Sequence, residues 1–191
     1  MGRPRNFETD SVVEAAMEAF WTHGYANCSP AQLAEATGIG KGSLYNAFGS
    51  KRELFDLAMA RYDRAGVELA QGILSQPGTA RERLTAWLRF LVDSDLEAPV
   101  PRGCLVVNTA MELAGQDTAA TKAVRDAYEH MVEAFEARIE QGQREGDVRA
   151  EVDARAYAEY LMTTAGGLRV TAKVSDAETM YRIIDTTLST L

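Results

Sequence analysis

Residues 29–48 read SPAQLAEATGIGKGSLYNAF, a stretch that predicts two short helices joined by a turn. Ser29 is a favourable N-cap residue, and Pro30 suits the first helical position, where its missing N–H costs nothing. Gln32 follows Ser29 at the spacing of a capping box. Gly38 can adopt the left-handed conformation that ends a helix. Two short helices that meet at a glycine turn have the form of a helix-turn-helix.

The second of these helices, over residues 41–48, has two different sides. Its polar or amphipathic residues are Lys41, Ser43, Tyr45 and Asn46, and its apolar residues are Leu44, Ala47 and Phe48. A helix that enters the major groove of DNA needs this division, because its donors face phosphates and base edges while its apolar side packs on the protein. The pattern therefore predicts a recognition helix. An ordinary helical hairpin is the alternative for this motif taken alone.

Basic residues stand on both sides of the motif. Arg3 and Arg5 form a short arm before the first expected helix, and such arms reach the minor groove or phosphates. A solvated terminus is the alternative for the arm. Lys51 and Arg52 begin the helix after the motif, where the macrodipole disfavours cations, so we expect them to have an anionic partner. Phosphate is the natural candidate.

Charge is distributed unevenly along the chain. The net charge is −8, yet residues 1–52 carry as many acids as cations, so the whole excess lies in residues 53–191. Between Gly38 and Arg52 there are three cations and no acids. The local field at a contact surface matters more than the sum over the chain. We therefore expect the acidic part to repel DNA and the N-terminal part to approach it.

Five segments of the N-terminal part carry a resemblance to a known family. They are AAMEAF (15–20), HGY (23–25), QLAEATGI (32–39), KGSLYNAF (41–48) and SKREL (50–54). From Arg3 to about Leu57 the chain resembles the TetR family of transcriptional regulators. The resemblance implies an all-α homodimer, with a DNA-binding head of three helices and a larger C-terminal body that binds an inducer. The head corresponds to residues 1–50, with its helix-turn-helix at about 29–48, and the body to residues 51–191.

Double-stranded DNA is the partner that the motif and the resemblance together predict. The residues expected to bind it are Arg3, Arg5, Ser29, Lys41, Gly42, Ser43, Tyr45, Asn46 and Lys51. Asn46 occupies a position that varies in the family, so we expect it to help set the operator sequence. A symmetric dimer places its two recognition helices about one DNA turn, ~34 Å, apart and reads a palindromic operator.

The rest of the sequence predicts helices, with only Leu105–Val107 ambiguous between helix and strand. Helices are expected at about residues 10–23 before the motif, and at about 50–74, 79–95, 102–115, 118–144, 153–173 and 176–190 after it. Two further breaks, at residues 77–78 and 97–101, contain prolines and are expected to be loops. The fold class that this pattern predicts is all-α.

Several functional classes lack their sequence signals. No apolar run is long enough to span a bilayer, and the N-terminus lacks the apolar segment of a signal peptide. Cys28 and Cys104 suggest no disulfide framework, so the expectation is a reduced, cytoplasmic protein without a membrane partner. His23 and His130 show no metal-ligand spacing, and no nucleotide or nucleophile motif is present. We therefore expect no enzyme activity, no cofactor and no metal.

The last two expected helices carry apolar and small residues at helical spacing. The residues predicted to form a dimer interface are Leu161, Ala165, Leu168, Ala172, Met180, Ile183, Ile184, Thr187 and Leu188. The resemblance implies that the two helices pair with their copies in a four-helix bundle. The alternative is that the same residues form the internal core of one subunit.

An inducer pocket is expected inside the body, lined mostly by apolar side chains. The candidate ligand-binding residues are Tyr62, Trp87, Phe90, Cys104, Asn108, Met111, Glu112, Met131 and Phe135, with Leu91, Tyr128, Tyr160 and Met162 as further positions to inspect. Asn108 and Glu112 stand one turn apart on an apolar helix and so share a face. If they are buried they need partners, which can be a ligand or other groups of the protein.

The segment around Cys104 allows a different signal. Arg102, Gly103 and Cys104 resemble a subgroup of TetR-like regulators that carries a Gly-Cys pair, some members of which sense electrophiles or oxidants through a cysteine. A thiol at the start of a helix beside Arg102 favours its reactive thiolate form, and Lys173 adds to this if the fold brings it near. The alternative is a buried structural cysteine.

Taken together, the sequence predicts a homodimeric repressor released from a palindromic operator by a small-molecule inducer. A repressor that senses electrophiles through Cys104 is the first alternative. An architectural protein that binds DNA without sequence preference is the second, although such a protein is expected to be more basic.

Overall fold

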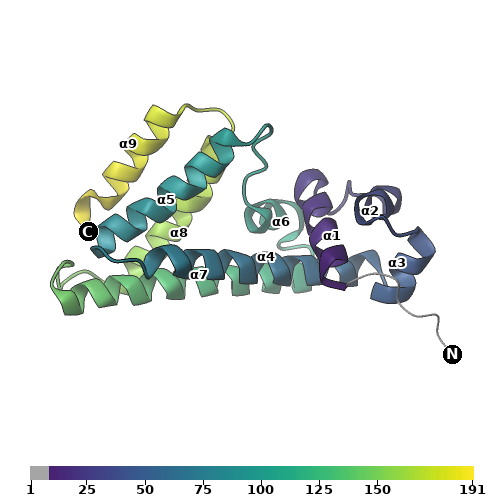
Figure 1. Cartoon of the computed structure of the whole chain (residues 1–191). Coiled ribbons are helices and arrows are strands. Elements are labelled where there is room, and N and C mark those ends of the chain that lie inside the picture. The colour runs from purple at the N-terminus through teal and green to yellow at the C-terminus, as the bar shows by residue number, and fades with distance from the viewer. Residues whose placement is uncertain (1–8) are drawn as a thin grey trace. The chain divides into compact units, whose positions relative to one another are not determined.

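The computed structural model describes residues 9–191, which form nine α-helices and no strand (Figure 1). The helices are α1 (Thr9–His23), α2 (Pro30–Thr37), α3 (Lys41–Phe48), α4 (Lys51–Leu74), α5 (Ala80–Glu97), α6 (Leu105–Leu113), α7 (Thr118–Glu145), α8 (Ala154–Thr171) and α9 (Ala177–Thr187), followed by a 3₁₀ turn (Leu188–Thr190). The all-α prediction is confirmed. In this described part, no helix is long and apolar enough to cross a membrane.

The chain divides into two compact units. The first comprises Met1–Arg64 and Leu105–Val124, and the second comprises Ala65–Cys104 and Arg125–Leu191. Helices α4 and α7 therefore contribute residues to both units. The division expected from the sequence is one of roles, with DNA binding in residues 1–50 and ligand binding and dimerisation in residues 51–191, and it stays a prediction.

Aromatic packing holds the first unit together around α1. The apolar stripe of α1 is buried from Val12 to Phe20, as its spacing predicts. The Phe20 ring meets the Phe55 ring edge-on at 5.0 Å between centroids, and the centroid of the Tyr25 ring lies 4.8 Å from that of Phe55. Burial of a large apolar side chain stabilises a fold by roughly 1.5–3 kcal/mol. These contacts hold α1 against α4 and fix the base on which α2 and α3 stand.

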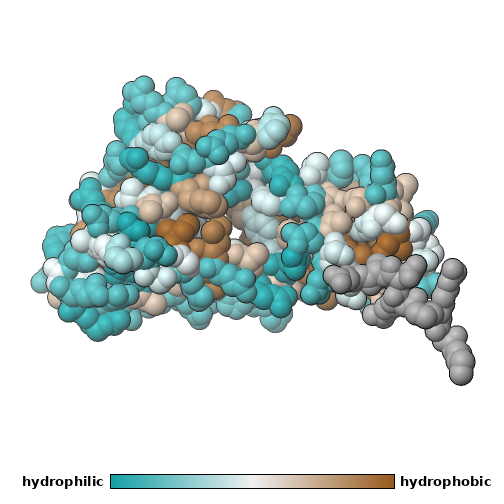
Figure 2. Space-filling view, in the orientation of Figure 1, coloured by the Kyte–Doolittle hydropathy of each residue, from teal (hydrophilic) through white to brown (hydrophobic). Residues whose placement is uncertain are grey.

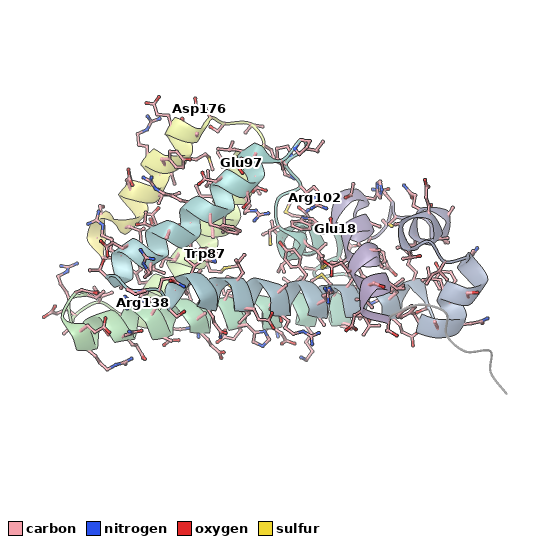
Figure 3. All side chains as sticks on the ribbon, in the orientation of Figure 1. Glu18, Trp87, Glu97, Arg102, Arg138 and Asp176 are labelled. Atoms are coloured by element: carbon pink, nitrogen blue, oxygen red, sulfur yellow. The ribbon has the colours of Figure 1, made fainter. Side chains whose placement is uncertain are left out.

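The second unit has its own core, made by the distal part of α4 with α5, α7, α8 and α9. Trp87 of α5 meets Phe135 of α7 with 4.6 Å between ring centroids. Arg138 is buried on α7 and donates from Nη2 to the Gly78 carbonyl at 2.6 Å, which fixes the turn before α5 (Figure 3). On the face shown in Figure 2, hydrophilic residues cover most of the surface and apolar residues gather in small patches.

Within a single chain, the stripe predicted as a dimer interface lies in this core. Eight of its members are buried within one chain, namely Leu161, Ala165, Leu168, Ala172, Met180, Ile184, Thr187 and Leu188, and Ile183 is partly buried against them. The reason is that α9 packs on α5 and α8 and covers these side chains. Side chains already covered within one chain have almost no surface left to bury against a second copy. The internal core was the alternative that the sequence left open.

Candidate DNA-binding surface

Helix α2 has the cap that the sequence predicts. Ser29 Oγ accepts the Gln32 N–H at 3.2 Å, and Gln32 Oε1 accepts the Ser29 N–H at 2.7 Å, so the capping box is complete. Gly38 ends the helix with φ 68°, in the left-handed region. Ile39 is buried directly after it. The chain therefore turns sharply and begins α3 two residues later.

Helix α3 presents a polar face on a buried apolar base. Lys41, Gly42, Ser43 and Asn46 are exposed, Tyr45 is half-buried, and Leu44 and Phe48 are buried. This is the division that a recognition helix needs. Burial raises the pKa of Tyr45, and Cys28 and Tyr25 raise it further, so the phenol stays neutral at pH 7 and can donate a hydrogen bond.

Gly42 stands in the first turn of α3 although nothing in the chain requires a glycine there. No atom lies within 4 Å of the position that a Cβ on Gly42 occupies in a substituted chain. A glycine inside a helix is less favourable than alanine by roughly 0.5–1 kcal/mol. Its bare backbone permits a close approach from outside, which suits the surface of a docked duplex.

The two cations at the start of α4 have different surroundings. Lys51 lies with Nζ 4.6 Å from the centre of the Tyr25 ring and donates to the Ala26 carbonyl at 3.4 Å. Arg52 pairs with Asp56 at 2.8 Å and also with Asp117. These hydrogen bonds raise the pKa of Arg52 against the opposing effect of burial, which is the largest single contribution. The expected anionic partner of Arg52 is therefore a pair of carboxylates rather than phosphate.

An open groove of about 630 Å³ lies between α1 and α2. Its lining is Ala15, Glu18, Ala19, Thr22, His23, Gln32, Glu35 and Ala36, and Figure 3 labels Glu18 on α1. None of the predicted ligand-binding residues lines this groove. Within the described residues no cluster of His, Cys, Asp and Glu could hold a metal ion.

The structure divides the predicted ligand-binding residues between the two units. Trp87, Met131 and Phe135 come together in the core of the second unit. Phe90 also belongs to the second unit but is 40% exposed. In the first unit, the Tyr62 ring packs edge-on against Trp21 at 5.0 Å, Asn108 is half-buried, and Met111 is 86% exposed.

Glu112 has its partners in the protein itself. Its Oε2 accepts the Tyr25 N–H at 2.8 Å, and its Oε1 accepts the Ala26 N–H at 2.5 Å. Both carboxylate oxygens are therefore engaged by the loop between α1 and α2. Of the two partners that the sequence left open for Glu112, the structure gives the internal one.

Cys104 lies directly before α6, which begins at Leu105 rather than at the expected residue 102. The later start follows from Gly103, whose φ of 71° is left-handed and cannot continue a helix. Cys104 is half-buried and takes part in no disulfide. Lys173 approaches the residue before it, since its Cε lies 3.3 Å from the position of a Cβ on Gly103. Cys28, in contrast, is fully buried, and burial raises the pKa of its thiol against the opposing charge of Lys51.

A buried ion pair beside Cys104 had no signal in the sequence. Asp95 is 3% exposed, and its Oδ2 lies 2.6 Å from Arg169 Nε. Arg169 also donates to the Gly103 carbonyl at 2.5 Å. Burial raises the pKa of Asp95, with Arg169 and the Gly103 N–H opposing the shift. The pair fixes the backbone of the residue before Cys104.

The geometry of α2 and α3 agrees with comparisons to known proteins. The family model described as bacterial regulatory proteins, tetR family, matches residues 12–58, and that of the tetracyclin repressor-like C-terminal domain matches residues 80–187. A cysteine mutant of the TetR family transcriptional regulator CifR, solved with 26-bp double-strand operator DNA, is 34% identical with a TM-score of 0.87, and 98% of each chain is covered.

Curated relatives span almost the whole chain. The HTH-type transcriptional repressor ComR of Escherichia coli is 26% identical over 98% of this chain and 90% of its own length. The HTH-type transcriptional regulator YezE of Bacillus subtilis is 28% identical over the full length of both. The similarity therefore includes both the helix-turn-helix and the helices that follow it.

Proposed function

This chain belongs to the TetR family of non-enzymatic, DNA-binding transcriptional regulators, and from this premise we propose that it is a homodimeric repressor of a palindromic operator, released by a small-molecule inducer. The exposed polar face of α3 on its buried base carries the proposal. CifR, a relative of similar fold, is solved on operator DNA, and ComR is named a repressor, which supports the same role here.

Each group on this surface has a proposed task. Lys41, Ser43, Tyr45 and Asn46 face base edges and phosphates, and Gly42 lets the duplex approach the backbone. Ser29 and Lys51 hold phosphates at the starts of α2 and α4. Arg3 and Arg5 add electrostatic affinity, although both lie outside the described residues. In this proposal residues 1–50 are the DNA-binding head and residues 51–191 are the body that binds the inducer.

For the dimer we propose the outer face of α8 in place of the buried stripe. Its exposed members recur every three or four residues, which places them on one side of the helix and the turn after it, and they are Ala156, Tyr160, Thr163, Gly167, Val170 and Val174. They are uncharged, and Val170 and Val174 are 53% and 87% exposed. Small residues allow two such helices to approach closely. Ile183 on α9 is the one member of the first-predicted set that still reaches the surface.

Two kinds of inducer fit the structure, and one of them has a specific observation in its favour. Trp87, Met131 and Phe135 remain candidates for an apolar pocket in the second unit. Electrophile sensing through Cys104 is the second candidate function. It is favoured by the surroundings of Cys104, which is only half-buried, takes part in no disulfide and follows Gly103, the residue that Lys173 approaches.

Selection of bound DNA from a random pool tests the proposal. We expect an enriched palindrome that is preferred over bulk DNA by roughly 10³ or more. The enriched DNA sequence is then titrated with the wild type and with Cys104→Ser, each in the presence and absence of a mild electrophile. Release by the electrophile in the wild type alone supports the cysteine sensor, and indifference to it supports a pocket ligand. If no sequence is enriched, the protein is not a specific repressor.

A further inference from the structure

The loop between α1 and α2 is held from two sides. Gly24 ends α1 with φ 77°, and its N–H donates to the Phe20 carbonyl at 2.8 Å. The next two N–H groups, of Tyr25 and Ala26, both donate to Glu112 of α6. On the other side, Lys51 donates to the Ala26 carbonyl and covers the Tyr25 ring. Glu112 and Lys51 thus fix the backbone of Tyr25 and Ala26 and the ring of Tyr25.

The approach of Glu112 to this loop is close. A Cβ on Gly24 falls 3.0 Å from Glu112 Oε2, which is tighter than an ordinary van der Waals contact. Hydrogen bonds from N–H groups to a carboxylate are roughly twice as strong as neutral ones. A carboxylate that receives two consecutive N–H groups therefore defines the position of the loop sharply.

Glu112 stands where helix dipoles disfavour a negative charge. It lies in the last turn of α6, and it contacts the loop that directly follows the end of α1. Both helix ends carry partial negative charge, which opposes a carboxylate. Its place is thus maintained by the two hydrogen bonds and not by the field of the helices.

The loop between α1 and α2 positions the phosphate-binding part of the proposed DNA surface. Ser29, the cap of α2, follows the loop after Cys28, and Cys28 is anchored in the core. Lys51 contacts the loop directly. From these contacts we infer that Glu112 is a positioning residue for operator binding, which acts through Tyr25 and Ala26 to place Lys51 and Ser29 against the DNA backbone. The inference rests on the proposed function.

Because Glu112 is negatively charged, its positioning role and its long-range charge have opposite effects on DNA affinity when it is replaced. Glu112→Gln removes one negative charge, and loss of a negative charge by itself strengthens binding to a polyanion. A glutamine also offers one oxygen where two N–H groups need acceptors, so one of them loses its partner. Weaker binding by Glu112→Gln therefore cannot come from long-range charge.

The experiment compares Glu112→Gln with Glu68→Gln, which removes the same charge from an exposed position of α4. Affinity for the selected palindrome is measured at several salt concentrations, with the folded fraction checked by circular dichroism. We expect Glu112→Gln to bind about tenfold more weakly than Glu68→Gln, the loss of one charge-assisted hydrogen bond. We also expect its slope of log K against log salt to fall by about 0.9, as one phosphate contact is lost.

Two further measurements secure the result. Glu112→Asp keeps the charge but shortens the side chain, and it replaces Glu112→Gln if that variant does not fold. Amide exchange at Tyr25 and Ala26 is expected to be slow in the wild type and faster in either variant. Binding and slope equal to those of Glu68→Gln overturn the positioning role. A wild type that enriches no palindrome overturns the proposed function instead.

Discussion

At the scale of single residues, Lys51 and Arg52 show how neighbours with the same charge differ in function. The contacts that the described residues make with Lys51 are a ring face and a carbonyl, both uncharged. Arg52 is paired with Asp56 and Asp117. A cation releases counterions from DNA only where it neutralises a phosphate. Lys51 is therefore the member of the pair that is left to meet DNA.

We expect Lys51→Ala to weaken binding to all DNA sequences alike. The slope of log K against log salt should fall by about 0.9, because one phosphate contact is lost. Arg52→Ala is the matched control, since it removes the same charge but should keep the slope and lower the melting temperature. Fluorescence anisotropy with operator and with random DNA measures both. An unchanged slope in Lys51→Ala removes Lys51 from the contact set.

Which residue-scale features the sequence predicts depends on how far apart the partners are. The Ser29 capping box and the left-handed Gly38 were predictable, because each depends on residues within one or two turns. The partners of Glu112 lie 87 and 86 residues away, and Asp117 lies 65 residues from Arg52. No local pattern marks such pairs. The loop contact of Glu112 thus needed the structure, although its charge on an apolar helix was visible.

At the scale of elements, the start of α7 combines a cap with an ion pair. Asp117 Oδ1 accepts the Ala120 N–H at 2.9 Å, and the same carboxylate pairs with Arg52. The hydrogen bond from Ala120 and then that from Arg52 lower the pKa of Asp117. This one side chain thus links the first turn of α7 to the first turn of α4.

The lowered pKa gives a pH dependence with a definite sign. The contribution of Asp117 to stability is present above its ordinary pKa of about 3.9 and is lost as pH falls through the lower value of the folded state. Asp117→Asn keeps an oxygen for the Ala120 N–H but does not titrate. We therefore expect its free energy of unfolding to fall less steeply with acidification below about pH 4. Urea unfolding at a series of pH values measures this, with Glu68→Gln as the carboxylate control, and a curve parallel to the wild type contradicts it.

Helix α8 shows why the sequence could not assign its faces. Two stripes of uncharged residues run along it, one through Leu161 and Leu168 and another through Tyr160 and Val170. Periodicity indicates that an apolar face exists but not which helix covers it. The first stripe was predicted as the interface, and α9 with α5 covers it within the chain. Only the packing of the whole second unit separates the two.

At the scale of the whole molecule, the proposed operator requires two heads, and therefore a dimer. A stable interface buries about 800 Å² on each partner, and its core is depleted of charge. The six exposed members that define the outer face of α8 are uncharged. A twofold axis brings each member of this face against its own copy or a neighbour, so a single substitution acts twice.

Val170→Glu is expected to break the dimer for this reason. Val170 is 53% exposed in the single chain, so a glutamate there leaves the fold intact but places two unpaired charges in the interface. The dimer dissociation constant should rise at least about a hundredfold, since each unpaired buried charge costs more than a neutral group. Val100→Glu is the matched control, because Val100 is 71% exposed in the loop before α6.

Sedimentation equilibrium measures the assembly, and selection from a random pool measures its consequence for DNA. A monomer carries one recognition helix, so Val170→Glu should enrich a single half-site where the wild type and Val100→Glu enrich two half-sites about one turn, ~34 Å, apart. A Val170→Glu protein that stays dimeric and still selects the palindrome places the interface on another surface of the second unit. The charged stripe of α9, formed by Glu178, Arg182 and Asp185, is then the next face to substitute.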